Sequence, residues 1–185
     1  MAAESTAEIC YEGSFELAGQ KWRLFIPDGA RGNNVQYRIY TSDAYDGENS
    51  LLLHSDKMGR CGIYPVKEAL EVHPGEKFKA SLYYKATTGL VIKPETPGVV
   101  IRVTFFDSKN QAMPQDAIFI CEDGIQVGGL KKKADYKQSN QWKPIIGSFS
   151  VPPSCAKMVI FAFLWEGMGD VLLDNIRIVR LPNKE

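Results

Sequence analysis

The sequence holds few side chains that could carry out catalysis. Its two histidines stand apart: His54 ends an apolar run, and His73 precedes a Pro-Gly turn. Neither has a second metal ligand at a useful spacing, and the zinc motif H-E-x-x-H does not occur. The G-x-S-x-G elbow of serine hydrolases and the phosphate-binding loop G-x-x-x-x-G-K-[ST] are also missing. The sequence therefore does not predict metal-assisted, serine-dependent or nucleotide chemistry.

A pair of carboxylates is the remaining route to catalysis. A glycosidase needs two of them facing one cleft, roughly 5 to 10 Å apart. Only Asp107, at the end of an expected strand, and Glu166, directly after Trp165, come close to such a position. We therefore predict no catalytic residue, and keep a polysaccharide lyase or glycosidase as the alternative.

Aromatic and arginine side chains suggest binding instead. If the strands expected at 77–86 and 99–106 neighbour each other in one sheet, Tyr83 lies beside Arg102 and Phe106. Tyr64 and Trp165 could then wall the two ends of a cleft. Tyrosine and tryptophan offer a flat apolar face with a polar edge, and arginine adds a planar fork of donors. Such a surface suits a sugar ring, which has apolar faces and hydroxyls at its edge.

Several aromatic residues have an equally plain structural role. Phe106 could mark a change of face at a strand end. Trp142 stands before Pro144 in a strand-like segment, and we expect it in the core or at a hinge. Tyr37 and Tyr40 fall on opposite faces of their strand, so only one of them could face a cleft. Tyr83 is the strongest binding candidate, because its strand neighbours on that face are lysines and a serine.

The composition is that of an ordinary globular domain. The chain has 185 residues, 44% hydrophobic and 24% charged, with 22 basic and 22 acidic side chains. A net charge of zero gives no general attraction to nucleic acid or to an anionic membrane. No apolar run approaches the roughly 20 residues of a membrane span, and the start, MAAESTAEIC, is not a signal peptide. The protein is therefore expected to be cytosolic, or else a module taken from a longer secreted chain.

Short alternating segments separated by turn signals run along most of the chain. This pattern predicts an all-β fold, a two-sheet antiparallel sandwich or jelly roll, with almost no helix. We expect one domain over residues 1–185, with a flexible lead-in at 1–10. The segments read as strands are NVQYRIYT, SLLLHS, KFKASLYYKA, VVIRVTFFD, KMVIFAFLW and DVLLDNIRIVR.

The sequence also contains four cysteines and one long loop. Cys10, Cys61, Cys121 and Cys155 are far apart and allow three full disulfide pairings. No C-x-x-C occurs, and we expect buried free thiols. The glycine- and lysine-rich segment 121–144 is read as a loop, and its three consecutive lysines, Lys131–Lys133, as solvated rather than as a contact patch.

The order of six segments resembles a known superfamily. The segments are EGSFELAG, GENSLLLHS, GIYPVKEALEVHPGEKFKASLYYKA, VVIRVTFFDSKN, QWKPIIGSFSVPPSCAKMVIFAF and GDVLLDNIRIV. Together they resemble the jelly-roll carbohydrate-binding modules that accompany xylanases, glucanases and arabinofuranosidases. The chain departs from that pattern where Ser14 replaces a second glycine before Phe15, and where Asn175 follows Asp174 in place of a second aspartate.

The resemblance also offers a role for Asp174, a carboxylate in the middle of the last expected strand, where a charge is costly to bury. Modules of this kind commonly hold a structural calcium where the first and last strands meet. The resemblance places its ligands at Glu16, Asp174 and the DGEN turn that contains Asp46 and Glu48. Calcium prefers six to eight oxygen ligands. Without a metal, Asp174 could face solvent, cap a bulge, or pair with a basic side chain such as Arg177 or Lys21.

The resemblance implies a non-catalytic module that binds a plant-type β-linked polysaccharide such as xylan, β-glucan or mannan. It further implies a monomer, tethered to a catalytic domain of a longer secreted or cell-surface chain, with no nucleic-acid or membrane partner. The alternatives are a polysaccharide-degrading enzyme and a protein-interaction domain of similar fold.

Overall fold

The computed structural model describes residues 7–16, 22–27, 34–66, 69–130, 136 and 139–182. Lys131–Lys133 lie outside these residues. The described chain is all-β, as predicted, and its one helical element is a single 3₁₀ turn, Pro114–Asp116. The strands are β1 (Glu8–Gly13), β2 (Trp22–Phe25), β3 (Val35–Tyr40), β4 (Ser50–Pro65), β5 (Leu70–Glu71), β6 (Lys77–Ala86), β7 (Val91–Ile92), β8 (Gly98–Phe106), β9 (Ile118–Cys121), β10 (Gly124–Val127), β11 (Lys143–Ser150) and β12 (Lys157–Leu181).

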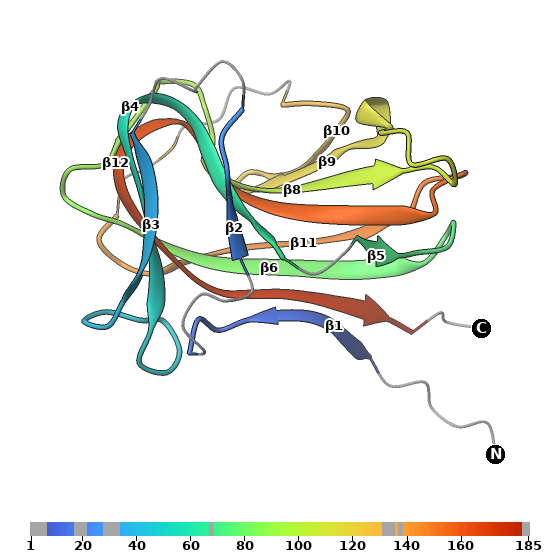
Figure 1. Ribbon diagram of the computed structural model, residues 1–185, viewed down its shortest axis with the longest axis horizontal. Helices are drawn as coiled ribbons and strands as arrows, with labels where there is room; N and C mark the ends of the chain where they lie inside the picture. Colours follow the sequence, from blue (N-terminus) through green and yellow to red (C-terminus); the bar gives the residue numbers. More distant parts are fainter. Residues whose placement is uncertain are drawn as a thin grey trace.

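Two long strands, β4 and β12, connect the two layers of the sandwich (Figure 1). The first part of β12 pairs with β8 and with the second part of β4. Its second part pairs with β6, with the first part of β4 and with β1. Between the parts, Glu166 and Gly169 have positive φ angles of 52° and 102°. These bends let one strand pass from one layer to the other.

Each layer takes its strands from both ends of the sequence. The first layer runs β10-β9-β8-β12-β4-β2. The second layer is built by β11, β6, the second part of β12, β1, the first part of β4 and β3. All the pairings are antiparallel.

The core lies between the layers and follows the alternation of the strands. From β6 it receives Phe78 and Leu82, and from β8 it receives Ile101 and Phe105, all at 0% exposure. These two strands therefore face each other across the core. The prediction that they neighbour each other in one sheet is wrong, because each pairs with a different part of β12. Strand alternation determines which side chains point inward, but it carries no information about which strand lies alongside.

The N-terminal segment is more ordered than predicted. Residues 8–10, expected in a flexible lead-in, already belong to β1, where Ile9 pairs with Val179 of β12. All four cysteines are free thiols, as expected. Burial raises the pKa of Cys61 to about 12, which makes its thiol unreactive at neutral pH. No helix in the described part of the chain is long and apolar enough to cross a membrane.

Close packing at one glycine gives a stability prediction. A Cβ on Gly62 would lie 2.4 Å from the carbonyl oxygen of Ala162 and 2.9 Å from the ring of Phe163. Gly62→Ala should therefore lower the free energy of unfolding by about 1–3 kcal/mol, because overpacking forces neighbouring groups apart. Denaturant unfolding measures the change.

Gly89→Ala is the matched control, since a Cβ there meets nothing within 4 Å. It should leave stability unchanged or raise it by up to about 1 kcal/mol. Equal losses in the two variants would contradict the packing described at Gly62.

Candidate functional site

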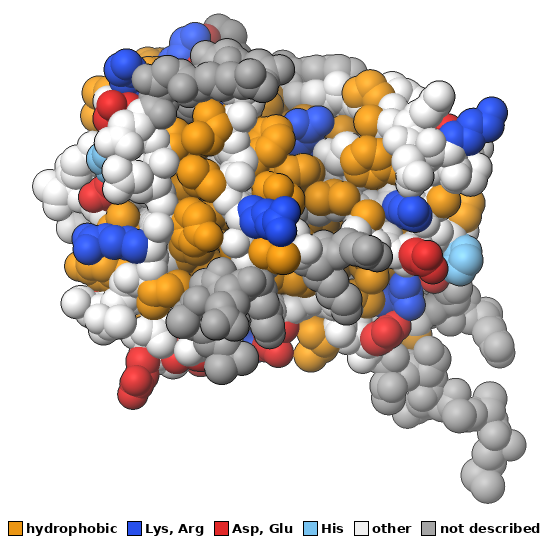
Figure 2. Space-filling model, in the orientation of Figure 1, with side chains coloured by type: hydrophobic (Ala, Val, Ile, Leu, Met, Phe, Trp, Pro, Cys, Tyr) orange, Lys and Arg blue, Asp and Glu red, His pale blue; other side chains and the backbone are white. Residues whose placement is uncertain are grey.

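The outer surface of the first layer is covered by aromatic rings. We call the aromatic face the set of rings at outward positions of β2, β4, β9 and β12. Its members are Phe25, Tyr64, Phe119, Phe161, Phe163 and Trp165. Figure 2 shows hydrophobic side chains gathered in rows on one face of the molecule. In Figure 1, β2 and β4 run over the same face.

Strand register brings these rings together from distant parts of the chain. Phe161 pairs with Arg102 of β8, and Arg102 pairs with Phe119 of β9. On its other side Phe161 lies next to Tyr64, because the adjacent pair is Ala162 with Ile63. The resulting row crosses five strands, from Phe119 through Arg102, Phe161 and Tyr64 to Arg23. Neighbouring strands lie about 4.8 Å apart, so this row is about 19 Å long.

The rings pack edge to face and keep part of their surface open. Phe25 lies 5.2 Å from Phe161 and 5.5 Å from Phe163, in T-shaped contacts. Tyr64 lies 5.7 Å from Phe161 at a tilt of 42°. Phe163 is buried, whereas Tyr64, Phe161 and Trp165 remain partly exposed. The buried rings of Phe119 and Phe163 pack beside the exposed ones and limit the positions that these can adopt.

Two arginines lie over this aromatic surface. The guanidinium of Arg60 sits 4.1 Å from the centre of the Trp165 ring, and its Nε donates to Glu166 at 2.6 Å. The guanidinium of Arg102 sits 5.6 Å from the centre of the Phe119 ring. Burial lowers the pKa of Arg102, and the nearby charge of Arg60 adds to that effect. The Nε of Arg102 is buried and has no hydrogen-bond partner among the described residues.

Three of the predicted binding residues thus share one face: Tyr64, Arg102 and Trp165. The sequence analysis missed Phe25, Phe119, Phe161 and Phe163. The segment 157–165 reads as apolar on both faces, so nothing in it separates its core side chains from its surface ones. Apolar residues on both faces of this segment could have indicated that its outward face is an apolar surface patch.

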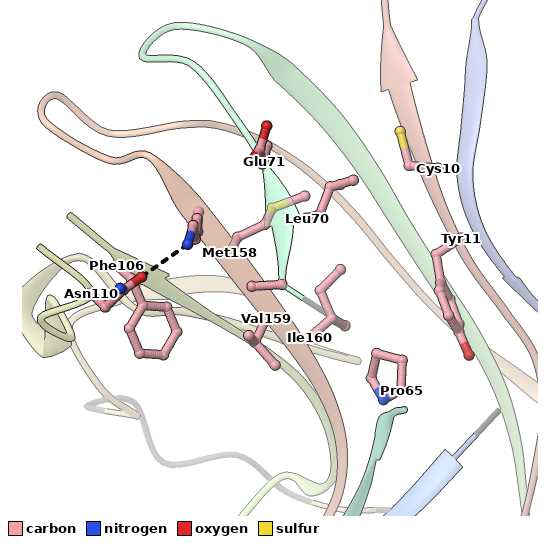
Figure 3. A pocket seen from close by; sticks show the side chains of 12 residues that line it. Cys10, Tyr11, Pro65, Leu70, Glu71, Phe106, Asn110, Met158, Val159 and Ile160 are labelled. Atoms are coloured by element: carbon pink, nitrogen blue, oxygen red, sulfur yellow. Dashed lines mark hydrogen bonds between the residues drawn. The ribbon is translucent and has the colours of Figure 1, made fainter. Parts of the chain in front are cut away.

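Phe106 lies apart from the row, at the far end of β8. It lines a cavity of about 640 Å³ that is bounded by β1, β5, the end of β4 and the start of β12 (Figure 3). Beside it, Lys157 donates to the side-chain oxygen of Asn110 at 3.0 Å. Phe106 keeps its predicted outward position, but it does not join Tyr64 and Trp165.

Tyr83 lies on the opposite side of the molecule, and its predicted grouping with Arg102 and Phe106 is wrong. It points outward from β6, in the second layer, where the ring of Tyr45 stacks on it at 3.5 Å. Trp142, expected in the core or at a hinge, is half-buried here and lies 6.2 Å from Tyr45. Its Nε1 donates to Asp43, which also binds Lys85. Tyr83 and Trp142 thus hold the loop 43–49 against the second layer.

The two carboxylates considered for catalysis are far apart. Asp107 follows the end of β8, while Glu166 follows Trp165, which pairs with Gly98 at the start of β8. The eight residue steps between these ends span about 26 Å at 3.3 Å per residue. Asp107 accepts bonds from the backbone N–H groups of Lys109 and Gln111 and so stabilises a turn. These two residues cannot form a glycosidase pair.

Asp174 is fully buried and anchors the loop 43–49. One of its oxygens accepts hydrogen bonds from the backbone N–H groups of Tyr45 at 2.8 Å and Asp46 at 3.1 Å, and the other accepts one from Asn175. Burial raises the pKa of Asp174, and these backbone bonds act against the rise. Glu16 acts in the same way on the other end of the loop, accepting bonds from the backbone N–H groups at positions 48 and 49.

In this structure two of the carboxylates named for the calcium site bind backbone N–H groups. The carboxylates of Glu16 and Asp174 face N–H donors, and Glu48 contributes its backbone N–H rather than a carboxylate. Among the described residues, no three His, Cys, Asp or Glu side chains gather in a group able to hold a metal ion.

Calcium binding stays a prediction. Thermal scans with a chelator and with added calcium would test it, since saturation at 100 times Kd stabilises by about 2.7 kcal/mol.

The comparison with known proteins rests on structure alone. No protein-family model matches the sequence, and no curated protein matches it. Among solved structures, the CBM22-1 xylan-binding domain of Paenibacillus barcinonensis Xyn10C matches with a TM-score of 0.65 at 18% identity, covering 98% of this chain and 100% of that one. The protein has the jelly-roll fold of these carbohydrate-binding modules.

Two further matches place the same fold in larger proteins. The CBM22-1–GH10 modules of Clostridium thermocellum Xyn10B, solved with xylohexaose, match with a TM-score of 0.64 at 14% identity over 96% of this chain and 29% of that one. The enzymatically active domain of bacteriophage CBA120 tailspike protein 4 matches with a TM-score of 0.58 at 14% identity over 88% of this chain. This chain spans only 20% of that tailspike domain. At these identities the likeness shows the fold.

The anchoring role of Asp174 gives a second stability prediction. Asp174→Ala should lower the free energy of unfolding by about 3 kcal/mol, because the buried N–H of Asn175 and the part-buried N–H groups of Tyr45 and Asp46 lose their acceptor. The matched control is Asp46→Ala, which removes an exposed carboxylate from the same loop and leaves the backbone bond in place. Denaturant unfolding compares the two, and similar losses would show that Asp174 is not the anchor.

Proposed function

We propose that this protein is a non-catalytic polysaccharide-binding module that uses the aromatic face. The observation that carries the proposal is the row of aromatic rings and guanidinium groups across five strands of the first layer, in which Phe161 and Tyr64 are partly exposed. Tyr64, Phe161 and Trp165 offer partly exposed aromatic surface to a sugar ring, and the arginines supply donors for its hydroxyls. A row of about 19 Å can contact several consecutive sugars of an extended chain.

The structural neighbours support a plant-type β-glycan as the ligand. Two of them are named as xylan-binding or were solved with xylohexaose. We therefore propose xylan, β-glucan or mannan as the ligand class, bound along the chain. The distance between Asp107 and Glu166 supports binding without hydrolysis. Attachment to a catalytic domain, as in Xyn10B, and a secreted or cell-surface location are parts of the same proposal.

Affinity electrophoresis in polysaccharide gels tests the proposal. The unmodified protein should be retarded by at least one of xylan, β-glucan and mannan. Tyr64→Ala should weaken that binding by about tenfold, because a central contact residue of an interface contributes more than 1 kcal/mol. Tyr64→Phe should retain most of the binding, since it keeps the ring.

The matched control is Tyr45→Ala, which removes an exposed tyrosine from the opposite side of the molecule. It should bind as the unmodified protein does, and thermal scans should show all variants folded at the assay temperature. If Tyr45→Ala lost binding while Tyr64→Ala kept it, the second layer would be the binding surface. If no polysaccharide retarded the unmodified protein, the proposed function would be wrong.

A further inference from the structure

The charged side chains at the outward positions of the first layer are basic, and the carboxylate of Glu166 pairs with one of them, Arg60. The outward positions of β2, β4, β8, β9 and the first part of β12 are occupied, in the described residues, by Arg23, Phe25, Arg60, Gly62, Tyr64, Gly98, Val100, Arg102, Thr104, Phe106, Phe119, Cys121, Lys157, Val159, Phe161, Phe163 and Trp165. Three of these are arginines, one is a lysine, and none is Asp or Glu. The chain as a whole is neutral, so this is a local excess of positive charge.

Only one of the three arginines has a carboxylate partner in the described residues. Arg60 is paired with Glu166, which follows the paired part of β12. Arg23 lies exposed at the edge of the row, on β2. Arg102 is the second residue of the row, between Phe119 and Phe161, with its guanidinium over the ring of Phe119.

The environment of Arg102 is that of a cation lacking its anion. Its Nε is buried without a hydrogen-bond partner among the described residues, and a buried donor left unpaired costs free energy. Arginine is the side chain best suited to a carboxylate, because its planar fork can donate two parallel hydrogen bonds. Partly burying a charged guanidinium among aromatic rings costs free energy. A ligand with only neutral hydroxyls would not need that charge, whereas a carboxylate would pair with it.

We propose that the aromatic face binds an acidic polysaccharide, one whose sugars carry uronic acid carboxylates, and that Arg102 binds a carboxylate. This inference rests on the proposed function and specifies its ligand. Stacking on the rings supplies affinity for the sugar backbone, and Arg102 distinguishes chains with carboxylates from chains without them. Arg23 adds positive charge at one end of the row, whereas the charge of Arg60 is paired with Glu166.

The experiment compares each acidic polysaccharide with its own carboxyl-reduced form, in which the carboxylates have become alcohols. The probes are glucuronoxylan and polygalacturonate, each in both forms, and binding is measured by affinity electrophoresis and calorimetry. The unmodified protein should bind at least one acidic form about tenfold more tightly than its reduced form, since a charge-assisted hydrogen bond contributes about 1.5–3 kcal/mol. Added salt should reduce this preference.

Three variants identify the group responsible. Arg102→Gln should abolish the preference for the acidic form, and Arg102→Lys, which keeps the charge but loses the fork, should retain part of it. The matched control is Arg38→Gln, because Arg38 is an exposed arginine of β3 in the second layer whose guanidinium lies 5.9 Å from the ring of Tyr40. It should keep the full preference.

The outcomes separate this inference from the proposed function. Equal binding of the acidic and reduced forms of both probes would overturn the inference and leave polysaccharide binding in place. A preference that survives in Arg102→Gln but is lost in Arg38→Gln would overturn the assignment to the aromatic face. Absence of binding to all acidic, reduced and neutral polysaccharides would overturn the proposed function itself. Thermal scans confirm that each variant is folded.

Discussion

The hydrogen bonding of one strand, β12, determines most of this structure. Over its 25 residues β12 pairs with six other strands, and it belongs to both layers of the sandwich. A strand buried in the middle of a sheet must satisfy its backbone N–H and C=O groups on both edges. The positions of β8, β6, β4 and β1 are therefore set by the edges that β12 offers, and so is the face on which each of their side chains emerges.

The same strand accounts for the two unusual surfaces of the protein. In its first part, outward side chains are Phe161, Phe163 and Trp165, and rings from β2, β4 and β9 gather on them. In its second part, the outward side chain at position 174 is a carboxylate, and the loop 43–49 folds over it to supply backbone donors. The first part of β12 thus contributes to a partly exposed apolar surface. The second part provides a carboxylate that the loop 43–49 covers.

These surfaces differ in what they leave unsatisfied. The carboxylate of Asp174 accepts three backbone hydrogen bonds, which offset part of the cost of its burial. The guanidinium of Arg102 has ring contacts but no described acceptor for its Nε. The bonds of Asp174 serve the fold, whereas the guanidinium of Arg102 can still bind an acceptor on a ligand. Buried polar atoms without a hydrogen-bond partner also occur in the second layer, at Asn175 Oδ1 and Arg177 Nε. The partly exposed rings beside Arg102 are therefore the basis for assigning function to the first layer.

The sequence by itself determined the fold class and the direction of most side chains. Alternation with a period of two residues correctly placed Leu82 and Phe105 inward and Tyr83 and Arg102 outward. Only the tertiary structure decided which strands are neighbours, and so it separated Tyr83 from Arg102 and joined Phe161 to Tyr64. The reason is that alternation looks the same whichever strand lies alongside, while the pairing depends on backbone bends within β12 and on contacts between residues a hundred positions apart.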